Sequence, residues 1–196
     1  MSYLLPLLAY LFGSISSAVM VARLLDLPDP RTVGSGNPGA TNILRLGSKG
    51  GAALTLTGDV LKGLLPVLLA RVLSDDPVIL ASTAVGAFIG HLFPIFFAFQ
   101  GGKGVATGLG VYLALSPWLG VALVGTWLAV ALLFRYSSLA AMATAALSPL
   151  LTHLLLPGLP YLLLSVVLAV LLLWRHRSNL RRLLAGDEDR MTLRRR

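Results

Sequence analysis

Residues 32–45 combine the residue types that a phosphate site needs, in the sequence T-V-G-S-G-N-P-G-A-T-N-I-L-R. Three glycines and a proline rule out a helix here and predict a loop whose backbone N–H groups can turn toward one point, a geometry that holds phosphate. Short polar side chains add hydrogen-bonding groups, and Arg45 adds a planar cation that fits phosphate oxygens. The candidate binding residues are Gly34, Ser35, Gly36, Asn37, Gly39, Thr41, Asn42 and Arg45.

A second glycine-rich loop, formed by Gly101, Gly102, Lys103 and Gly104, directly precedes an apolar segment expected to be helical. Backbone N–H groups, the positive end of a helix dipole and a lysine would meet there, which is typical of an anion site. The Walker A pattern G-x-x-x-x-G-K-[ST] is absent, so nucleotide hydrolysis is not inferred. Either loop alone could be a plain polar turn between membrane helices. Two such loops in one apolar chain favour phosphate binding.

A third polar segment, residues 175–182 with the sequence R-H-R-S-N-L-R-R, follows the last apolar stretch. His176 and Asn179 are three apart and so share a helix face, where they could offer a titratable imidazole and an amide. The alternative is an ordinary basic end of a membrane span. That alternative explains Arg181 and Arg182 but does not require His176 or Asn179, so both interpretations stay open for these two residues.

Asp59 and Lys62 lie three apart inside an apolar stretch, where an isolated charge is costly. We expect a mutually neutralising pair with a structural role, although a site role is the alternative. His91 follows Gly90 in another apolar stretch and is expected to be a hydrogen-bonded packing residue. The sequence shows no zinc-type ligand spacing, no G-x-S-x-G elbow and no cysteine, so we expect no metal and no cofactor.

The composition indicates a membrane protein that crosses the bilayer several times. Of the 196 residues, 56% are hydrophobic and only 12% are charged, whereas a soluble domain carries about 25% charged residues. The net charge of +8 is not a nucleic-acid signature, because half of the 16 Lys and Arg residues lie in a polar C-terminal tail at about 175–196. Such a tail beside a membrane span suits an anionic cytoplasmic leaflet.

Seven apolar segments are expected to be transmembrane helices of one all-α membrane domain covering residues 1–196: 3–22, 52–73, 78–99, 104–116, 118–134, 139–156 and 161–174. The fourth segment is short, about 20 Å as a helix against a hydrocarbon core of about 30 Å, and Pro117 separates it from the next. Counting both as crossings places the N-terminus outside and the C-terminus in the cytoplasm, as the positive-inside rule favours. All three polar segments then emerge on the cytoplasmic face.

Four ordered motifs resemble those of the bacterial acyl-phosphate:glycerol-3-phosphate acyltransferase family. They are G-S-G-N-P-G-A-T-N-I-L-R, G-D-V-L-K-G, G-H-L-F-P-x4-F-x-G-G-K-G-V-A-T and R-H-R-S-N-L-x-R-L-x-x-G-x-E, and they extend from residue 34 to Glu188. The resemblance places the family's functional serine and arginine on Ser35 and Arg45, and its glycine-rich loop on residues 101–104. The histidine, asparagine and glutamate of the family's last motif fall on His176, Asn179 and Glu188, the last of these with a structural role.

The resemblance implies transfer of a fatty acyl group from acyl phosphate to the 1-hydroxyl of glycerol 3-phosphate, giving lysophosphatidic acid and inorganic phosphate, the first acylation of phospholipid synthesis. It implies a site facing the cytoplasm in a bacterial inner membrane. It also names a soluble phosphate acyltransferase as a candidate supplier of acyl phosphate. The catalytic candidates are Ser35, Arg45, Lys103, His176 and Asn179. The acyl chain is expected to enter between small-faced helices, such as those carrying Gly13–Ser17 and Gly86–Gly90.

The His-x4-Asp arrangement that many glycerolipid acyltransferases use as a base is absent from this sequence. Because the donor is an activated mixed anhydride, positioning and charge stabilisation could supply most of the rate. We therefore expect that a phosphate of the bound substrates, not a side chain, takes the hydroxyl proton. A different class, a transporter or channel for an organophosphate, is the alternative, because short helices aimed at anions also occur in transporters.

Overall fold

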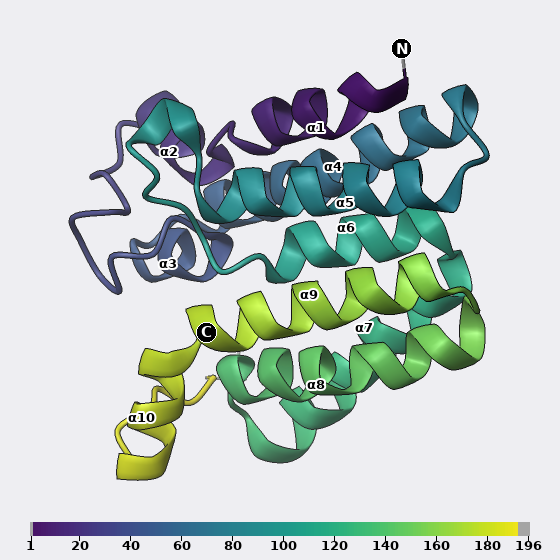
Figure 1. Ribbon diagram of the computed structural model, residues 1–196. Coiled ribbons are helices and arrows are strands. Elements are labelled where there is room, and N and C mark those ends of the chain that lie inside the picture. Colours follow the sequence, from purple (N-terminus) through teal and green to yellow (C-terminus); the bar gives the residue numbers. More distant parts are fainter. Residues whose placement is uncertain (1, 192–196) are drawn as a thin grey trace. The chain divides into compact units, whose positions relative to one another are not determined.

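The computed structural model of the protein describes residues 2–191, which form helices joined by loops (Figure 1). The α-helices are α1 (Leu5–Gly13), α2 (Ser17–Leu24), α3 (Ala40–Arg45), α4 (Lys49–Leu73), α5 (Pro77–Leu92), α6 (Val105–Leu115), α7 (Pro117–Phe134), α8 (Ser137–Leu155), α9 (Leu159–Arg175) and α10 (Arg177–Ala185). Two short 3-10 helices are η1 (Ser2–Leu4) and η2 (Ile95–Phe97). The predicted all-α class is confirmed for the described residues. The last part of the predicted tail, 192–196, lies outside them.

Within residues 2–191, five helical stretches are long and apolar enough to cross a membrane: Ser2–Leu24, Lys49–Leu73, Pro77–Phe97, Pro117–Phe134 and Ser137–Leu155. Leu159–Arg175 reaches that standard only together with Arg177–Ala185, from which it is bent by 55°. Val105–Leu115 is apolar but shorter. Each of the seven expected segments is therefore helical, and five or six have the length of a membrane span.

The predicted break at Pro117 is confirmed by the local geometry. Helix α6 ends at Leu115, and Pro117 is the first residue of α7. Ser116 caps α7, because its side-chain oxygen accepts a hydrogen bond from the backbone nitrogen of Leu119 at 3.3 Å. Proline fits this position, where its missing N–H would have no helical partner in any case.

The first apolar segment differs from the single helix expected over 3–22. It is interrupted at residues 14–16, between α1 and α2. The interruption releases the carbonyl of Ile15 from helical bonding, and Lys62 Nζ donates to that oxygen at 3.1 Å. A charged side chain from another helix thus satisfies a backbone group that lipid could not. This partner comes from 47 residues further along the chain, so the sequence pattern around residue 15 does not reveal it.

The chain divides into two compact units, with the boundary between Leu115 and Ser116. In the first unit α1 packs on α5, and α4 packs on α6 and α5 (Figure 1). Glycines allow this close packing: a Cβ on Gly13, Gly86 or Gly90 would overlap backbone atoms of the facing helix. The expectation that an acyl chain enters between these small faces is wrong, because the two helices fill that space themselves. That both units form a single membrane domain stays a prediction.

Helix α6 runs through the first unit from the glycine loop to the far end of α4. Its preceding loop begins beside the end of α5, where Gly102 N donates to His91 O at 3.1 Å. Near its other end, the carbonyl of Ala114 accepts a hydrogen bond at 2.6 Å from Arg71, which lies in the last turn of α4. Glycines again permit close contact, because a Cβ on Gly63 or Gly110 would overlap the backbone of the partner helix.

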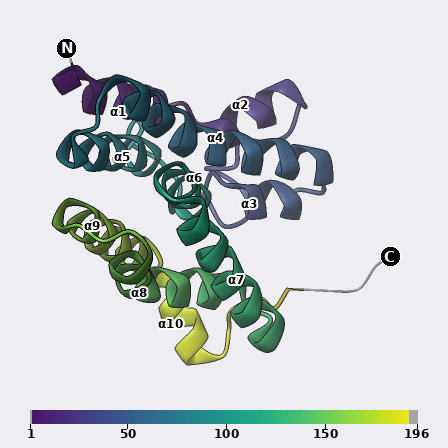
Figure 2. The same cartoon turned by 90° about the vertical axis from the view of Figure 1, so that its right-hand side faces the viewer.

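The second unit consists of α7, α8 and α9 packed in sequence, followed by α10 (Figure 2). The chain after α10 returns to the loop between α7 and α8. There Met191 N donates to Arg135 O at 2.7 Å, and Arg190 Nε donates to the hydroxyl of Tyr136 at 2.9 Å. Residues 187–191 are therefore attached to the start of α8 and are part of the fold.

We expect Gly63→Ala to lower the thermal stability of the protein in detergent, by about 1–3 kcal/mol, the usual cost of overpacking. The added Cβ meets the carbonyl of Thr107, a backbone atom that cannot move without shifting α6. Gly125→Ala in α7 is the matched control, because no atom lies within 4 Å of its Cβ position. Alanine is the better helix former, so the control should be neutral or stabilising. Equal melting temperatures for both variants would contradict the packing assigned to α4 and α6.

Candidate active site

The first glycine loop is held in shape by Asn42, whose side chain is buried. Its Nδ2 donates to Pro30 O at 2.8 Å and to Val33 O at 3.1 Å, and its Oδ1 accepts from Ser35 N at 3.0 Å. Gly34 passes directly over this amide with a φ of +62°, and a Cβ there would overlap Asn42 Oδ1. The structure thus gives Asn42 a positioning role, and its direct contact with a substrate stays a prediction.

The prediction of a loop without helix over residues 32–45 is only partly right. Residues 32–39 form turns, but Ala40–Arg45 is a short helix, α3. The last glycine of the stretch, Gly39, precedes α3, and the six residues that follow contain neither glycine nor proline, so nothing prevents helical bonding there. Ser35, Thr41 and Arg45 are exposed, and Asn37 is half-buried.

An ion pair that the sequence analysis did not single out supports the start of this loop. Arg31 Nη2 lies 2.6 Å from Asp29 Oδ2, and Arg31 Nε also donates to the same carboxylate. These hydrogen bonds hold the pKa of Asp29 below its ordinary value. The guanidinium also lies 5.9 Å from the ring centre of Phe97, in η2. Only the two-residue spacing of Asp29 and Arg31 could have indicated this pair.

The second glycine loop lies directly on the end of α5 and against the first loop. Gly101 stands so close to the carbonyls of His91 and Leu92 that a Cβ would overlap both. A Cβ on Gly102 would overlap the imidazole of His91 and would come within 3.2 Å of Pro38 O, in the first loop. The two loops therefore meet at Pro38 and Gly102, where only glycine fits.

Lys103 follows this contact and is half-buried, at the approach to α6. Gly104, between Lys103 and the helix, has a φ of +88°, and a Cβ there would overlap the ring of Phe88. The predicted order of glycine loop, lysine and helix start is thus confirmed. The end of the first unit that carries both loops also presents Arg45 and Lys103, two cations suited to phosphate.

The expected pair of Asp59 and Lys62 is present in α4, with Nζ 2.9 Å from Oδ1. Both side chains are buried. His91, predicted to be a packing residue, lies in the same cluster, with Nδ1 3.6 Å from the same Asp59 oxygen. The sequence pattern indicated the i, i+3 pair but not that it extends to the residue beneath the second glycine loop.

His176, Asn179 and Glu188 belong to the second unit. The chain bends at His176, between α9 and α10, and His176 Nδ1 lies 2.9 Å from Leu172 O. A carbonyl only accepts, so Nδ1 carries the proton of this hydrogen bond, and a neutral ring then has its lone pair on Nε2. Asn179 Nδ2 donates to Glu188 Oε1 at 2.7 Å. Both His176 and Asn179 are buried.

Glu188 ties three parts of the second unit together. Its Oε1 accepts from Ser138 Oγ at 2.6 Å as well as from Asn179, and its Oε2 accepts from Arg182 Nε at 2.8 Å. Burial raises the pKa of this carboxyl, but the hydrogen bonds from Ser138, Asn179 and Arg182 outweigh it and lower the pKa below the ordinary 4.5. The structural role expected for Glu188 has a clear physical basis in these bonds.

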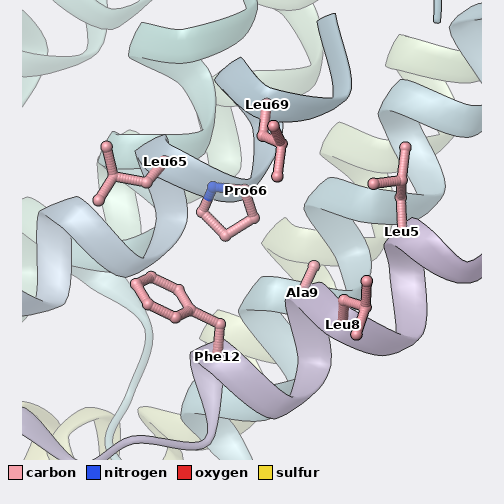
Figure 3. Close-up of a pocket in the computed structure, with 7 residues that line it drawn as sticks. All are labelled: Leu5, Leu8, Ala9, Phe12, Leu65, Pro66 and Leu69. Atoms are coloured by element: carbon pink, nitrogen blue, oxygen red, sulfur yellow. The ribbon is translucent and has the colours of Figure 1, made fainter. Parts of the chain in front are cut away.

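An apolar groove lies between α1 and α4 on the first unit (Figure 3). It encloses about 350 Å³, comparable to a small-molecule pocket. Its walls carry only hydrocarbon side chains, on two facing helices: Leu5, Leu8, Ala9 and Phe12 from α1, and Leu65, Pro66 and Leu69 from α4. Such a groove suits an alkyl chain and offers nothing to a polar solute. Within residues 2–191, no group of three His, Cys, Asp or Glu side chains is arranged for a metal ion.

Long apolar helices, a buried charge cluster inside them and two glycine-rich loops with Arg45 and Lys103 at their end define an integral membrane protein with a polar, cationic end. A profile of glycerol-3-phosphate acyltransferases matches residues 3–186. The glycerol-3-phosphate acyltransferase of Thioalkalivibrio sulfidiphilus is 55% identical over 183 residues, covering 93% of this chain and 90% of that protein. The chain belongs to the glycerol-3-phosphate acyltransferase family and is a membrane acyltransferase.

Two solved structures share the whole fold. PlsY (YgiH), an integral membrane glycerol 3-phosphate acyltransferase, matches in its glycerol 3-phosphate form with a TM-score of 0.93 and 38% identity, over 97% of this chain and 96% of that one. Its lysophosphatidic acid form matches with a TM-score of 0.90, over 97% and 95%. Membership of this family decides between enzyme and transporter in favour of the enzyme.

The pH dependence of stability should report on Glu188. Because the pKa of Glu188 is lowered in the folded protein, its carboxylate contributes stability at neutral pH, and this contribution is lost as the pH falls below about 4.5 toward the folded-state pKa. We expect Glu188→Gln to lower the unfolding temperature at pH 7 and to approach the unchanged protein at pH 3–4, as measured by thermal unfolding in detergent. Asp187→Asn, at an exposed neighbour, controls for the loss of one charge. A constant difference across this pH range would contradict the assignment.

Proposed function

We propose that the protein transfers a fatty acyl group from acyl phosphate to the 1-hydroxyl of glycerol 3-phosphate, giving lysophosphatidic acid and inorganic phosphate. The observation that carries this proposal is the meeting of two glycine loops at Pro38 and Gly102, with Arg45 and Lys103 on the same end of the unit. Both substrates carry phosphate, so two backbone cradles and several cations are needed to hold like charges close together. The family name and the two ligand forms of PlsY support the same acceptor and product.

We assign the roles as follows. Ser35, Arg45 and Lys103 contact the phosphate groups together with the backbone of the glycine loops. His176 and Asn179, in the second unit, are further catalytic candidates. The backbone cradle comprises Gly34, Gly36, Asn37, Gly39, Thr41, Asn42, Gly101, Gly102 and Gly104. The apolar groove between α1 and α4 receives the acyl chain, because its hydrocarbon walls match an alkyl tail and expose no polar group to it.

The topology that fits this site has seven crossings, with the N-terminus outside and the C-terminus in the cytoplasm of a bacterial inner membrane. The course of α6 supports this topology. The helix runs from the glycine loop at one end of the first unit to Arg71, in the last turn of α4, at the other end. With α6 as a crossing, the glycine loops and residues 175–182 share the cytoplasmic side. A soluble phosphate acyltransferase could then deliver acyl phosphate to the site.

The transfer itself balances without an added base. The hydroxyl oxygen of glycerol 3-phosphate forms the new ester bond to the acyl carbon, the bond from that carbon to the phosphate oxygen breaks, and the hydroxyl proton passes to a phosphate. His176 is the one side chain of the assigned set that could compete for this role, because its Nδ1 bond to Leu172 O leaves Nε2 as an acceptor in the neutral ring.

The donor is tested with the purified protein in lipid vesicles. We expect phosphate release from acyl phosphate only when glycerol 3-phosphate is present, with lysophosphatidic acid formed in equal amount, and no product from acyl-CoA. The leaving group explains the expected difference: in acyl phosphate it is a phosphate, which the assigned residues would bind next to the acyl carbon, whereas in acyl-CoA it is a thiolate. Equal activity with acyl-CoA would contradict the proposed donor while leaving the family assignment intact.

The base is tested with His176→Gln. If a substrate phosphate takes the proton, the maximal rate should fall by less than tenfold, apart from any change in the Michaelis constant for glycerol 3-phosphate. Loss of a true general base lowers the rate on the order of 10²–10⁴-fold. A fall of that size with unchanged substrate affinity would assign the base to His176, and steady-state kinetics at saturating acyl phosphate distinguishes the two outcomes.

A further inference from the structure

A buried cluster beneath the second glycine loop is larger than charge neutralisation requires. Asp59 Oδ1 contacts Lys62 Nζ at 2.9 Å and His91 Nδ1 at 3.6 Å, and all three side chains are buried. Lys62 is also satisfied by the carbonyl of Ile15. A buried ion pair alone is often no more stable than apolar residues of the same volume. Neutralisation of Lys62 by Asp59 does not explain why His91 is also part of this cluster, so His91 needs a further reason.

His91 contacts the second glycine loop through both its backbone and its ring. Its carbonyl accepts from Gly102 N at 3.1 Å, and the Nε2 edge of its ring occupies the position that a Cβ of Gly102 would take. The other face of Gly102 is limited by Pro38 O of the first loop. The ring of His91 thus sets how far Gly102 can move at the contact between the two loops.

We propose that Asp59 and His91 are positioning residues, which place Lys103 at the phosphate site by fixing the backbone of Gly101 and Gly102. Asp59 lies 3.6 Å from His91 Nδ1, too far for a short hydrogen bond, but its charge favours a proton on that nitrogen and so orients the ring. A loop made of glycines has no side chains of its own to restrict its shape. Its geometry must be imposed by the neighbour on which it lies. This inference rests on the proposed role of Lys103.

The alternative is that Asp59 serves only to neutralise Lys62. The two possibilities predict opposite orders for two variants. The variants are Lys62→Met and the double variant, in which Asp59→Asn is combined with Lys62→Met. Both variants lose the bond of Lys62 to Ile15 O, so the difference between them isolates Asp59. If neutralisation is the only role of Asp59, the double variant is the less perturbed of the two, because both charges leave together, whereas Lys62→Met alone strands a buried carboxylate. If Asp59 positions His91, the double variant loses the charge that orients the ring of His91, and Lys62→Met alone keeps it.

The test measures the Michaelis constant for glycerol 3-phosphate and the melting temperature in detergent. We expect the double variant to melt no lower than Lys62→Met and to have a Michaelis constant about tenfold or more above that of Lys62→Met, since a misplacement of about 1 Å can cost on the order of 100-fold. Lys62→Met is the matched control, because it loses the same bond to Ile15 O and keeps the carboxylate of Asp59 beside His91. The reverse order of the two variants would overturn the proposal.

A double-mutant cycle with Lys103→Ala then tests whether the effect passes through Lys103. If it does, adding Asp59→Asn to Lys62→Met should change the Michaelis constant little once Lys103 is alanine, whereas independent effects multiply. His91→Leu, which has a similar side-chain volume and removes the ring with both nitrogens, should repeat the rise and the loss of additivity if the double variant does not fold. Multiplicative effects would overturn the proposal. An unchanged Michaelis constant in Lys103→Ala would instead contradict the proposed function of the loop.

Discussion

A backbone carbonyl without a hydrogen-bond donor costs several kcal/mol inside a bilayer, because lipid offers no donor of its own. The break between α1 and α2 creates such a group at Ile15, and Lys62 satisfies it from α4. A buried ammonium then requires a carboxylate, which Asp59 supplies one turn away. The position of α2, and with it the start of the first glycine loop, thus depends on a charged pair in the middle of another helix.

The sequence indicated the parts of this arrangement that depend on local spacing. The apolar segments, the stop at Pro117, the glycine loop before α6 and the pairing of Asp59 with Lys62 all follow from residues within a few positions of one another. The short helix α3 was missed because the glycines before it dominate the pattern of residues 32–45. Residues 40–45 contain no glycine or proline, so they can form a helix although the glycines and the proline of residues 34–39 predict a loop.

Contacts between distant segments could not be predicted in the same way. The interruption of the first span depends on Lys62, and the small faces of α1 and α5 close on each other through carbonyls that no single-helix pattern contains. The meeting of Pro38 with Gly102 needs both loops to lie at the same end of the unit, which follows from the packing of α4, α5 and α6. Small residues on a helix predict that another helix packs closely against it. Which helix that is depends on how all the helices of the unit pack together.

A common principle connects the three polar segments: a buried polar side chain, within the segment or packed against it, shapes the residues proposed to meet the substrate. Asn42 bonds the backbone of the first loop, and Glu188 bonds Asn179 and Ser138 in the second unit. His91 underlies the second loop. Flexible, small or exposed groups suit the binding of phosphate, but they cannot hold their own geometry against thermal motion. In each segment, the residues that contact the ligand are therefore different from the buried residue that holds them in place. Substitutions at the buried partners should therefore alter binding although these side chains lie beneath the residues that meet the substrate.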